Sequence, residues 1–174
     1  MQSTTKKAAA GVAPRKEISA NRIASTARVL RQFRVVINSV KTHFRQVEKV
    51  AGVGGAQLWA LSVIQSNSGI GMNDLAQAMD IHQSTASNLV KTLVAHGMVE
   101  VTKAGADRRA VTLQIMPSGV KVLRKAPAPF AGVLPDALAS LDALTLSRLE
   151  RDLGKLILAL NADERAANTP LADL

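Results

Sequence analysis

The stretch from Ser84 to Gly97 limits what this chain can fold into more than any other. Its apolar residues recur with the period of a helix and predict one buried stripe: Ala86, Leu89, Val90, Leu93 and Val94. Polar residues three or four positions apart share the opposite face: Ser84, Ser87, Asn88 and Lys91. No acidic residue lies between Gln83 and Val99. A helix with such a face can lie against phosphates and base edges without charge repulsion.

A shorter helical pattern precedes this stretch. Leu75, Ala76 and Met79 fall on one helical face, and residues 80–83 form a tight connection to the next helix. Two short helices joined in this way are a helix-turn-helix, in which the second helix enters the major groove of DNA. We therefore expect a recognition helix from about Gln83 to His96.

Two alternating runs follow and predict a β-hairpin. Residues 99–102 and 110–115 each place apolar side chains on one face of a strand, and Gly105 lies in the loop between them. The charged residues at and near the tip are Lys103, Asp107, Arg108 and Arg109. A helix-turn-helix followed by a basic hairpin is a winged helix. The expected fold is mainly α-helical with a small β-hairpin wing.

These residues resemble the multiple-antibiotic-resistance regulators, the MarR family. The resemblance runs from about residue 28 to residue 160, and its most specific part is the Asp-Arg-Arg signature of the wing. The matching segments are Asp74-Leu75-Ala76, Ser84-Thr85, His96-Gly97-Met98-Val99, Asp107-Arg108-Arg109, Val111-Thr112-Leu113 and Gly119. Met116-Pro117-Ser118-Gly119 departs from the family's usual start of the next helix. Asn88 stands where a larger basic residue is common, which leaves open which bases are read.

The resemblance implies a transcription regulator, most simply a repressor, that binds a palindromic operator of double-stranded DNA as a homodimer. Base edges are expected to meet Gln83, Ser84, Thr85, Ser87 and Asn88. Contacts to phosphate or the minor groove are expected from Lys91, Lys103, Arg108 and Arg109. Asp107 is expected to brace the wing, because the matching Asp of the family pairs with a basic group there. The family further implies release by a small aromatic or anionic effector, bound where the dimerisation helices meet the winged helix.

Trp59 is the only Trp of the chain and lies in a helix predicted over residues 56–65, near that junction. Packing in the core is the simpler interpretation of Trp59, and contact with an effector is the alternative. His82 precedes the recognition helix, where it either touches phosphate or is solvated.

Apolar stripes near both ends of the chain predict the dimer interface. A stripe over residues 24–50 and Leu-rich segments between Leu138 and Leu160 offer more apolar surface than one winged helix can cover. Thr145 is expected to cap the last helix. The predicted parts are a flexible basic arm (1–20), a helical dimerisation region (21–52 and 127–160), the winged helix-turn-helix (53–126) and a flexible tail (161–174).

The formal charge of +9 is concentrated in two regions. Residues 1–34 hold eight Lys and Arg against one acid, and residues 82–125 hold seven against two. Two positive regions suit a polyanion such as DNA, and a generally basic composition is the alternative explanation. The N-terminal arm either contacts phosphates or keeps the protein soluble.

Several classes of protein are excluded or disfavoured. With no Cys, disulfides and thiolate metal sites are impossible, and three scattered His residues offer no metal site. We expect neither an enzyme nor a cofactor, because no nucleophile–base pair, carboxylate pair or Gly-rich phosphate loop is present. The absence of a run of about 20 apolar residues and of a secretion signal predicts a cytoplasmic protein without a membrane partner. The alternative function is a winged helix for protein contact, without sequence-specific DNA binding.

Overall fold

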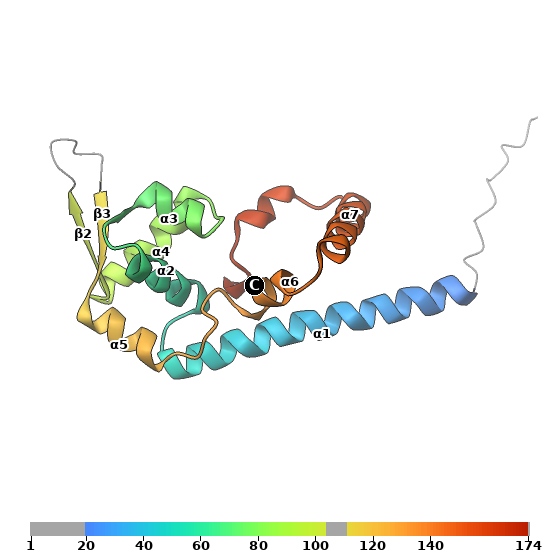
Figure 1. Cartoon of the computed structure of the whole chain (residues 1–174), viewed down its shortest axis with the longest axis horizontal. Helices are drawn as coiled ribbons and strands as arrows, with labels where there is room; N and C mark the ends of the chain where they lie inside the picture. Colours follow the sequence, from blue (N-terminus) through green and yellow to red (C-terminus); the bar gives the residue numbers. More distant parts are fainter. Residues whose placement is uncertain (1–19, 104–110, 174) are drawn as a thin grey trace, which may run out of the picture. The chain divides into compact units, whose positions relative to one another are not determined.

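The computed structural model describes residues 20–103 and 111–173 of the chain (Figure 1). The chain separates into two compact units, residues 1–35 and residues 36–174, and each is described by itself. The described elements are α1 (Ala20–Ala51), α2 (Gly55–Ser66), β1 (Ile70–Gly71), α3 (Met72–Ala78), α4 (Gln83–Ala95), β2 (Val99–Lys103), β3 (Val111–Ile115), α5 (Pro117–Lys125), α6 (Val133–Ala139), α7 (Ala143–Leu160) and the 3-10 helices η1 (Glu164–Asn168) and η2 (Leu171–Asp173). The mainly helical winged fold expected from the sequence is confirmed.

Helix α2 is the centre of the larger unit. Leu58, Leu61 and Ile64 are completely buried, because α2 packs against α3, α4, α5 and β3 at once. Full burial of each such side chain contributes about 1.5–3 kcal/mol. The core continues into the helix-turn-helix through Leu75 and Met79, as the apolar pattern predicted. The position of α4 is therefore fixed by the same core that fixes α2.

The wing is a three-stranded antiparallel sheet in the order β1-β3-β2. In its hairpin Thr102 pairs with Thr112, and their hydroxyl oxygens lie 2.7 Å apart. Strand β1 was not predicted, because the two-residue segment that pairs Ile70 with Leu113 is too short to show alternation. Val101 remains 41% exposed, so the apolar face of β2 is covered less than the alternation predicted.

The apolar stripe of α1 divides at the boundary between the two units. In the larger unit Val40, Phe44 and Val47 join the buried side chains, whereas Val36 and Ile37 stay exposed. In the smaller unit the apolar residues Ile23, Val29, Leu30 and Val35 are exposed. α1 ends where Gly52 takes a φ of 73°, a left-handed conformation that favours glycine and stops a helix.

The capping of the last helix corrects one prediction. Asp142, and not Thr145, is the N-cap of α7, because its carboxylate accepts both the Thr145 N–H at 2.9 Å and the Thr145 hydroxyl at 2.7 Å. These two donors, the hydroxyl first, lower the pKa of Asp142 below its ordinary value. Thr145 therefore completes the cap from the third position of the helix, and α7 begins at Ala143.

The segment after α7, which was predicted to be a flexible tail, contains two short 3-10 helices. Residues 164–168 form η1 and residues 171–173 form η2, Pro170 between them is buried, and Ala172 packs against the core beside α2. Burial raises the pKa of the neighbouring Asp173. Short 3-10 turns leave no periodic pattern in a sequence, which explains why this segment looked unstructured. Within residues 20–103 and 111–173, none of the helices combines the length and apolarity that a membrane crossing requires.

Candidate nucleic-acid interface and the adjoining cavity

The inner face of α4 anchors this helix in the core. Ala86, Leu89, Val90 and Leu93 are buried, as the sequence pattern predicted, but Val94, which was predicted to share this buried stripe, is 41% exposed near the end of the helix. Gly97 ends the helical run with a φ of 64°, and the next residue, Met98, donates its N–H to the carbonyl of Leu93 at 2.9 Å. A helix held along one whole face and at its C-terminal end can present the opposite face rigidly.

The opposite face of α4 carries the polar residues that were predicted to read DNA. Gln83, Ser84, Asn88 and Lys91 are exposed, whereas Thr85 and Ser87 are half-buried. In the described part of the chain, the side chains of Gln83, Asn88 and Lys91 have no hydrogen-bond or ion-pair partner. Their amide and ammonium groups are therefore available to an external partner. α4 itself contains no acidic residue.

His82 has a structural role that the sequence analysis missed. It is the N-cap of α4, and its Nδ1 accepts the Ser84 N–H at 3.3 Å and lies 2.8 Å from the Ser84 Oγ. A backbone N–H can only donate, so Nδ1 must carry a lone pair, and the Ser84 hydroxyl then donates to the same atom. Because its proton is used in this contact, the Ser84 oxygen can only accept a hydrogen bond from an external partner. His is not among the usual N-cap residues, so its type alone did not signal this role.

The predicted wing contacts cannot be placed in the same way. Lys103 ends β2, and its side chain is not among those described. Asp107, Arg108 and Arg109 lie outside the described residues. The roles assigned to these four residues remain predictions.

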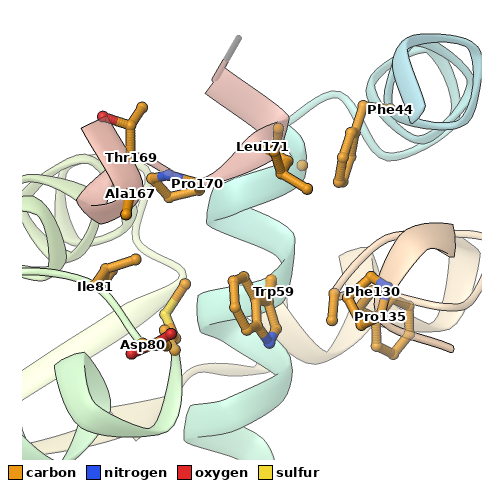
Figure 2. A pocket seen from close by; sticks show the side chains of 14 residues that line it. Phe44, Trp59, Asp80, Ile81, Phe130, Pro135, Ala167, Thr169, Pro170 and Leu171 are labelled. Carbon is orange, nitrogen blue, oxygen red and sulfur yellow. The ribbon is translucent and has the colours of Figure 1, made fainter. Parts of the chain in front are cut away.

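A cavity of about 170 Å³ lies beside the turn between α3 and α4 (Figure 2). Its walls come from the end of α1, from α2, from the helix-turn-helix, from the segment around α6 and from residues 167–172. Figure 2 shows Trp59 in the middle, with Asp80 and Ile81 on one side and Phe130 and Pro135 on the other. Trp59 is half-buried, so it serves both the core and this cavity wall. The sequence placed Trp59 near such a junction but did not identify its neighbours.

The cavity gathers most of the aromatic residues of the chain. The protein has one Trp, three Phe and no Tyr, and the cavity is lined by Trp59, Phe44 and Phe130. His43 holds two of these walls together: its Nε2 donates to the carbonyl of Pro129 at 3.0 Å, and its ring meets Phe44 edge-on at 5.3 Å. Neither Phe44 nor Phe130 was predicted as a site residue, because single Phe residues far apart in a sequence look like core.

The charge of the lining is negative. The described residues that line the cavity include one carboxylate, that of Asp80, and no Lys, Arg or His. Asp80 has a φ of 50°, a left-handed conformation that Asp tolerates better than most residues. It lies in the turn that joins α3 to α4, so a group bound here would touch the connection that directs α4. Among the described residues, no cluster of three His, Asp or Glu residues could hold a metal ion.

Comparison with known proteins agrees with this geometry. Residues 51–110 match the model of the MarR family. A protein of Thauera aromatica, named as a candidate transcriptional regulatory protein for the hcr operon, is 31% identical to this chain over 81 residues. The matched segment is 47% of this chain and 49% of that protein. The chain thus spans about half the length of the curated relative it matches.

Two crystal structures show the same fold at low identity. The S. aureus MepR–DNA complex is similar with a TM-score of 0.53 at 20% identity, and the match covers 74% of this chain and 95% of that one. A MepR-like protein complexed with pseudoligands is similar with a TM-score of 0.51 at 16% identity, covering 83% of this chain and 98% of that one.

Proposed function

We propose that this chain is a transcription regulator of the MarR family, whose model its central winged helix matches, and that it binds a palindromic operator as a homodimer. Repression is the simplest mode, because a dimer seated on a promoter blocks transcription by occupancy. The proposal rests on one observation above all: the exposed face of α4 carries neutral polar side chains that have no partner in the described part of the chain.

The chemistry of that face suits the major groove. The side-chain amides of Gln83 and Asn88 can each donate and accept, which is the pairing that adenine offers. Ser84 presents an acceptor, because His82 takes its hydroxyl proton, so it suits the amino group of adenine or cytosine. Lys91, one turn beyond Asn88, suits a phosphate. Thr85 and Ser87 are half-buried and would contribute shorter contacts at the edge of this face.

The wing is proposed to supply a different kind of contact. Lys103, Arg108 and Arg109 would meet phosphates or the negative potential of a narrow minor groove, and Asp107 would brace the hairpin. Contacts to the DNA backbone position a protein without reading sequence. Specificity therefore belongs to α4, and much of the affinity belongs to the wing.

Exposed apolar surface supports a homodimer. α7 leaves Leu144, Leu156, Ile157 and Leu160 exposed, and α1 leaves Leu30 exposed in the smaller unit. Water-exposed apolar area of this extent is typical of a surface that another chain covers. A second copy is the partner that a palindromic operator requires. Residues 21–52 and 127–160 are thus proposed as the dimerisation region, with residues 53–126 as the DNA-binding domain.

A small aromatic ligand in the Trp59 cavity is proposed to release the DNA. The cavity adjoins the α3–α4 turn, so a ligand that fits only one orientation of α4 would shift the protein toward that orientation. The MepR-like protein of the same fold was crystallised with pseudoligands. An anionic effector, the other class implied by the family, would find no basic side chain among the lining residues.

Binding to the DNA upstream of the protein's own gene tests the proposed function. We expect tight, saturable binding to that fragment and at least about 10³-fold weaker binding to random DNA of equal length at physiological salt. A winged helix used only for protein contact is the alternative, and it predicts weak and equal binding to both fragments. Equal binding would therefore favour the alternative.

A further inference from the structure

We propose that the effector of this protein is a single-ring aromatic cation, held by the aromatic walls of the Trp59 cavity and by the carboxylate of Asp80. This inference rests on the proposed function, and it names the ligand class for the same site. The size of the cavity indicates a single ring, and its aromatic lining and its charge both favour a cation.

The size of the cavity sets the size of the ligand. An engineered protein cavity of about 150 Å³ holds one benzene molecule. The cavity beside Trp59 measures about 170 Å³, so it takes one aromatic ring with a short substituent. Fused polycyclic compounds would need the walls to move.

The aromatic lining selects for positive charge. Three of the four aromatic side chains of the chain, Phe44, Trp59 and Phe130, line this one cavity from three different segments. The face of an aromatic ring is the negative end of its quadrupole, so it attracts a cation, and Trp does so most strongly. The T-shaped contact of His43 with Phe44 and its hydrogen bond to Pro129 keep two of these walls in place.

Asp80 adds a full negative charge to the same lining. Its carboxylate has no ion-pair partner in the described part of the chain, so it remains available for a cation. Lys41 and Arg45 line a separate hollow that shares Phe44 with this cavity. Glu48 and Asp173 line the same separate hollow. A carboxylate ligand in the Trp59 cavity would therefore meet Asp80 without a compensating cation.

The position of Asp80 also explains how binding would reach the DNA. Asp80 and Ile81 form the turn between α3 and α4, and His82, the next residue, caps α4 and fixes the Ser84 hydroxyl. A cation drawn to Asp80 would contact this turn, and the proposed DNA-reading face begins two residues after it, at Gln83. Ligand and DNA would thus compete through the geometry of one short connection.

Three probes of nearly equal size test the ligand class: benzylammonium, benzyl alcohol and benzoate. The fluorescence of Trp59 reports their binding to the free protein, and calorimetry checks each affinity. We expect benzylammonium to bind about tenfold more tightly than benzyl alcohol and benzoate to bind most weakly, because ring faces and carboxylate both favour the cation. Benzoate binding as tightly as benzylammonium would overturn the proposal.

Two variants separate the role of Asp80 from a general change of charge. Asp80→Asn should reduce the preference for benzylammonium over benzyl alcohol about threefold, because it keeps the shape of the side chain and removes its charge. Asp74→Asn removes a carboxylate of α3 that is not part of the lining, and it should leave the preference unchanged. An equal loss in both variants would show long-range charge and contradict a site at Asp80.

Operator binding without any probe is measured in parallel. If the protein prefers the cationic probe but does not bind its operator, the proposed function is wrong and the ligand class still holds. Operator binding without cation selectivity would overturn only the ligand class.

Discussion

At the scale of single residues, His82 connects the capping of a helix with the proposed chemistry of DNA recognition. Its Nδ1 holds the first turn of α4 and fixes the Ser84 hydroxyl as a donor to the protein. We expect His82→Ala to lower operator affinity and to relax the preference for adenine or cytosine opposite Ser84, because the freed hydroxyl can then donate as well as accept. Binding to a panel of operators varied at single positions measures both effects.

A matched variant controls for loss of the cap alone. His82→Asn keeps a side-chain oxygen that caps a helix well. It should therefore preserve the stability of α4 and restore most of the base preference that His82→Ala loses. If both variants retained the full preference of the unaltered protein, Ser84 would not be a base-reading residue of the kind proposed.

Gly119 is a second position where one residue decides the packing. A Cβ built there would lie 2.6 Å from the carbonyl oxygen of Met98 and 2.9 Å from the Ile115 side chain. The backbone oxygen cannot move aside cheaply, so Gly119→Ala should reduce the free energy of unfolding by about 1–3 kcal/mol. Chemical denaturation monitored by circular dichroism measures this. Gly154→Ala is the control, since its Cβ would meet nothing within 4 Å and should not destabilise α7.

Sequence patterns predicted the parts of the site that follow a helical or strand period. The buried and exposed faces of α4 and the β2–β3 hairpin follow directly from spacing. Spacing could not predict the Trp59 cavity, because its lining comes from separate segments that only the tertiary fold brings together: Phe44, Trp59, Asp80 and Phe130. The N-cap role of His82 was also hidden, because it depends on one ring nitrogen and not on the residue type.

At the scale of elements, the start of α7 has a pH dependence whose sign is fixed by its cap. Thr145 stabilises the ionised form of Asp142, so its pKa in the folded protein lies below the ordinary value of 3.8. The contribution of this cap is complete above pH 3.8 and is lost as the pH falls through the lowered pKa. We expect the stability of the protein relative to an Asp142→Asn variant to decline over that acid range and not above it.

Thermal unfolding by circular dichroism at a series of pH values measures this difference. Asn retains an oxygen that accepts the Thr145 N–H but does not titrate, so the comparison isolates the ionised carboxylate. A difference that stayed constant between neutral and acid pH would show that Asp142 does not act through its charge.

At the scale of the whole molecule, the dimer can be tested with two substitutions on one helix. Leu156 lies on the apolar side of α7 with Leu149 and Leu160, whereas Leu158 lies on the opposite side with Arg151 and Lys155. Both are exposed in the single chain, at 38% and 77%. We expect Leu156→Glu to give a monomer and Leu158→Glu to remain a dimer, because a buried charge without a partner opposes association.

Sedimentation or light scattering distinguishes these outcomes. Substitution is a cleaner test than truncation here, because residues beyond α7 pack against the core and their removal would disturb the winged helix itself. A dimer that survived Leu156→Glu would move the proposed interface away from α7. A monomer in the unaltered protein would contradict the homodimer altogether.

We propose that α4 reads the bases and that the wing contacts the DNA backbone. Measuring DNA affinity across a salt series tests these two roles most directly. Asn88→Ala should cost about 1–3 kcal/mol per half-site on the operator and leave the salt dependence unchanged, because a base contact releases no counterions. Arg108→Ala should weaken binding to operator and random DNA alike and reduce the salt slope by about one unit. If Asn88→Ala weakened binding to both DNAs equally, α4 would not read the operator sequence, and the central claim would be wrong.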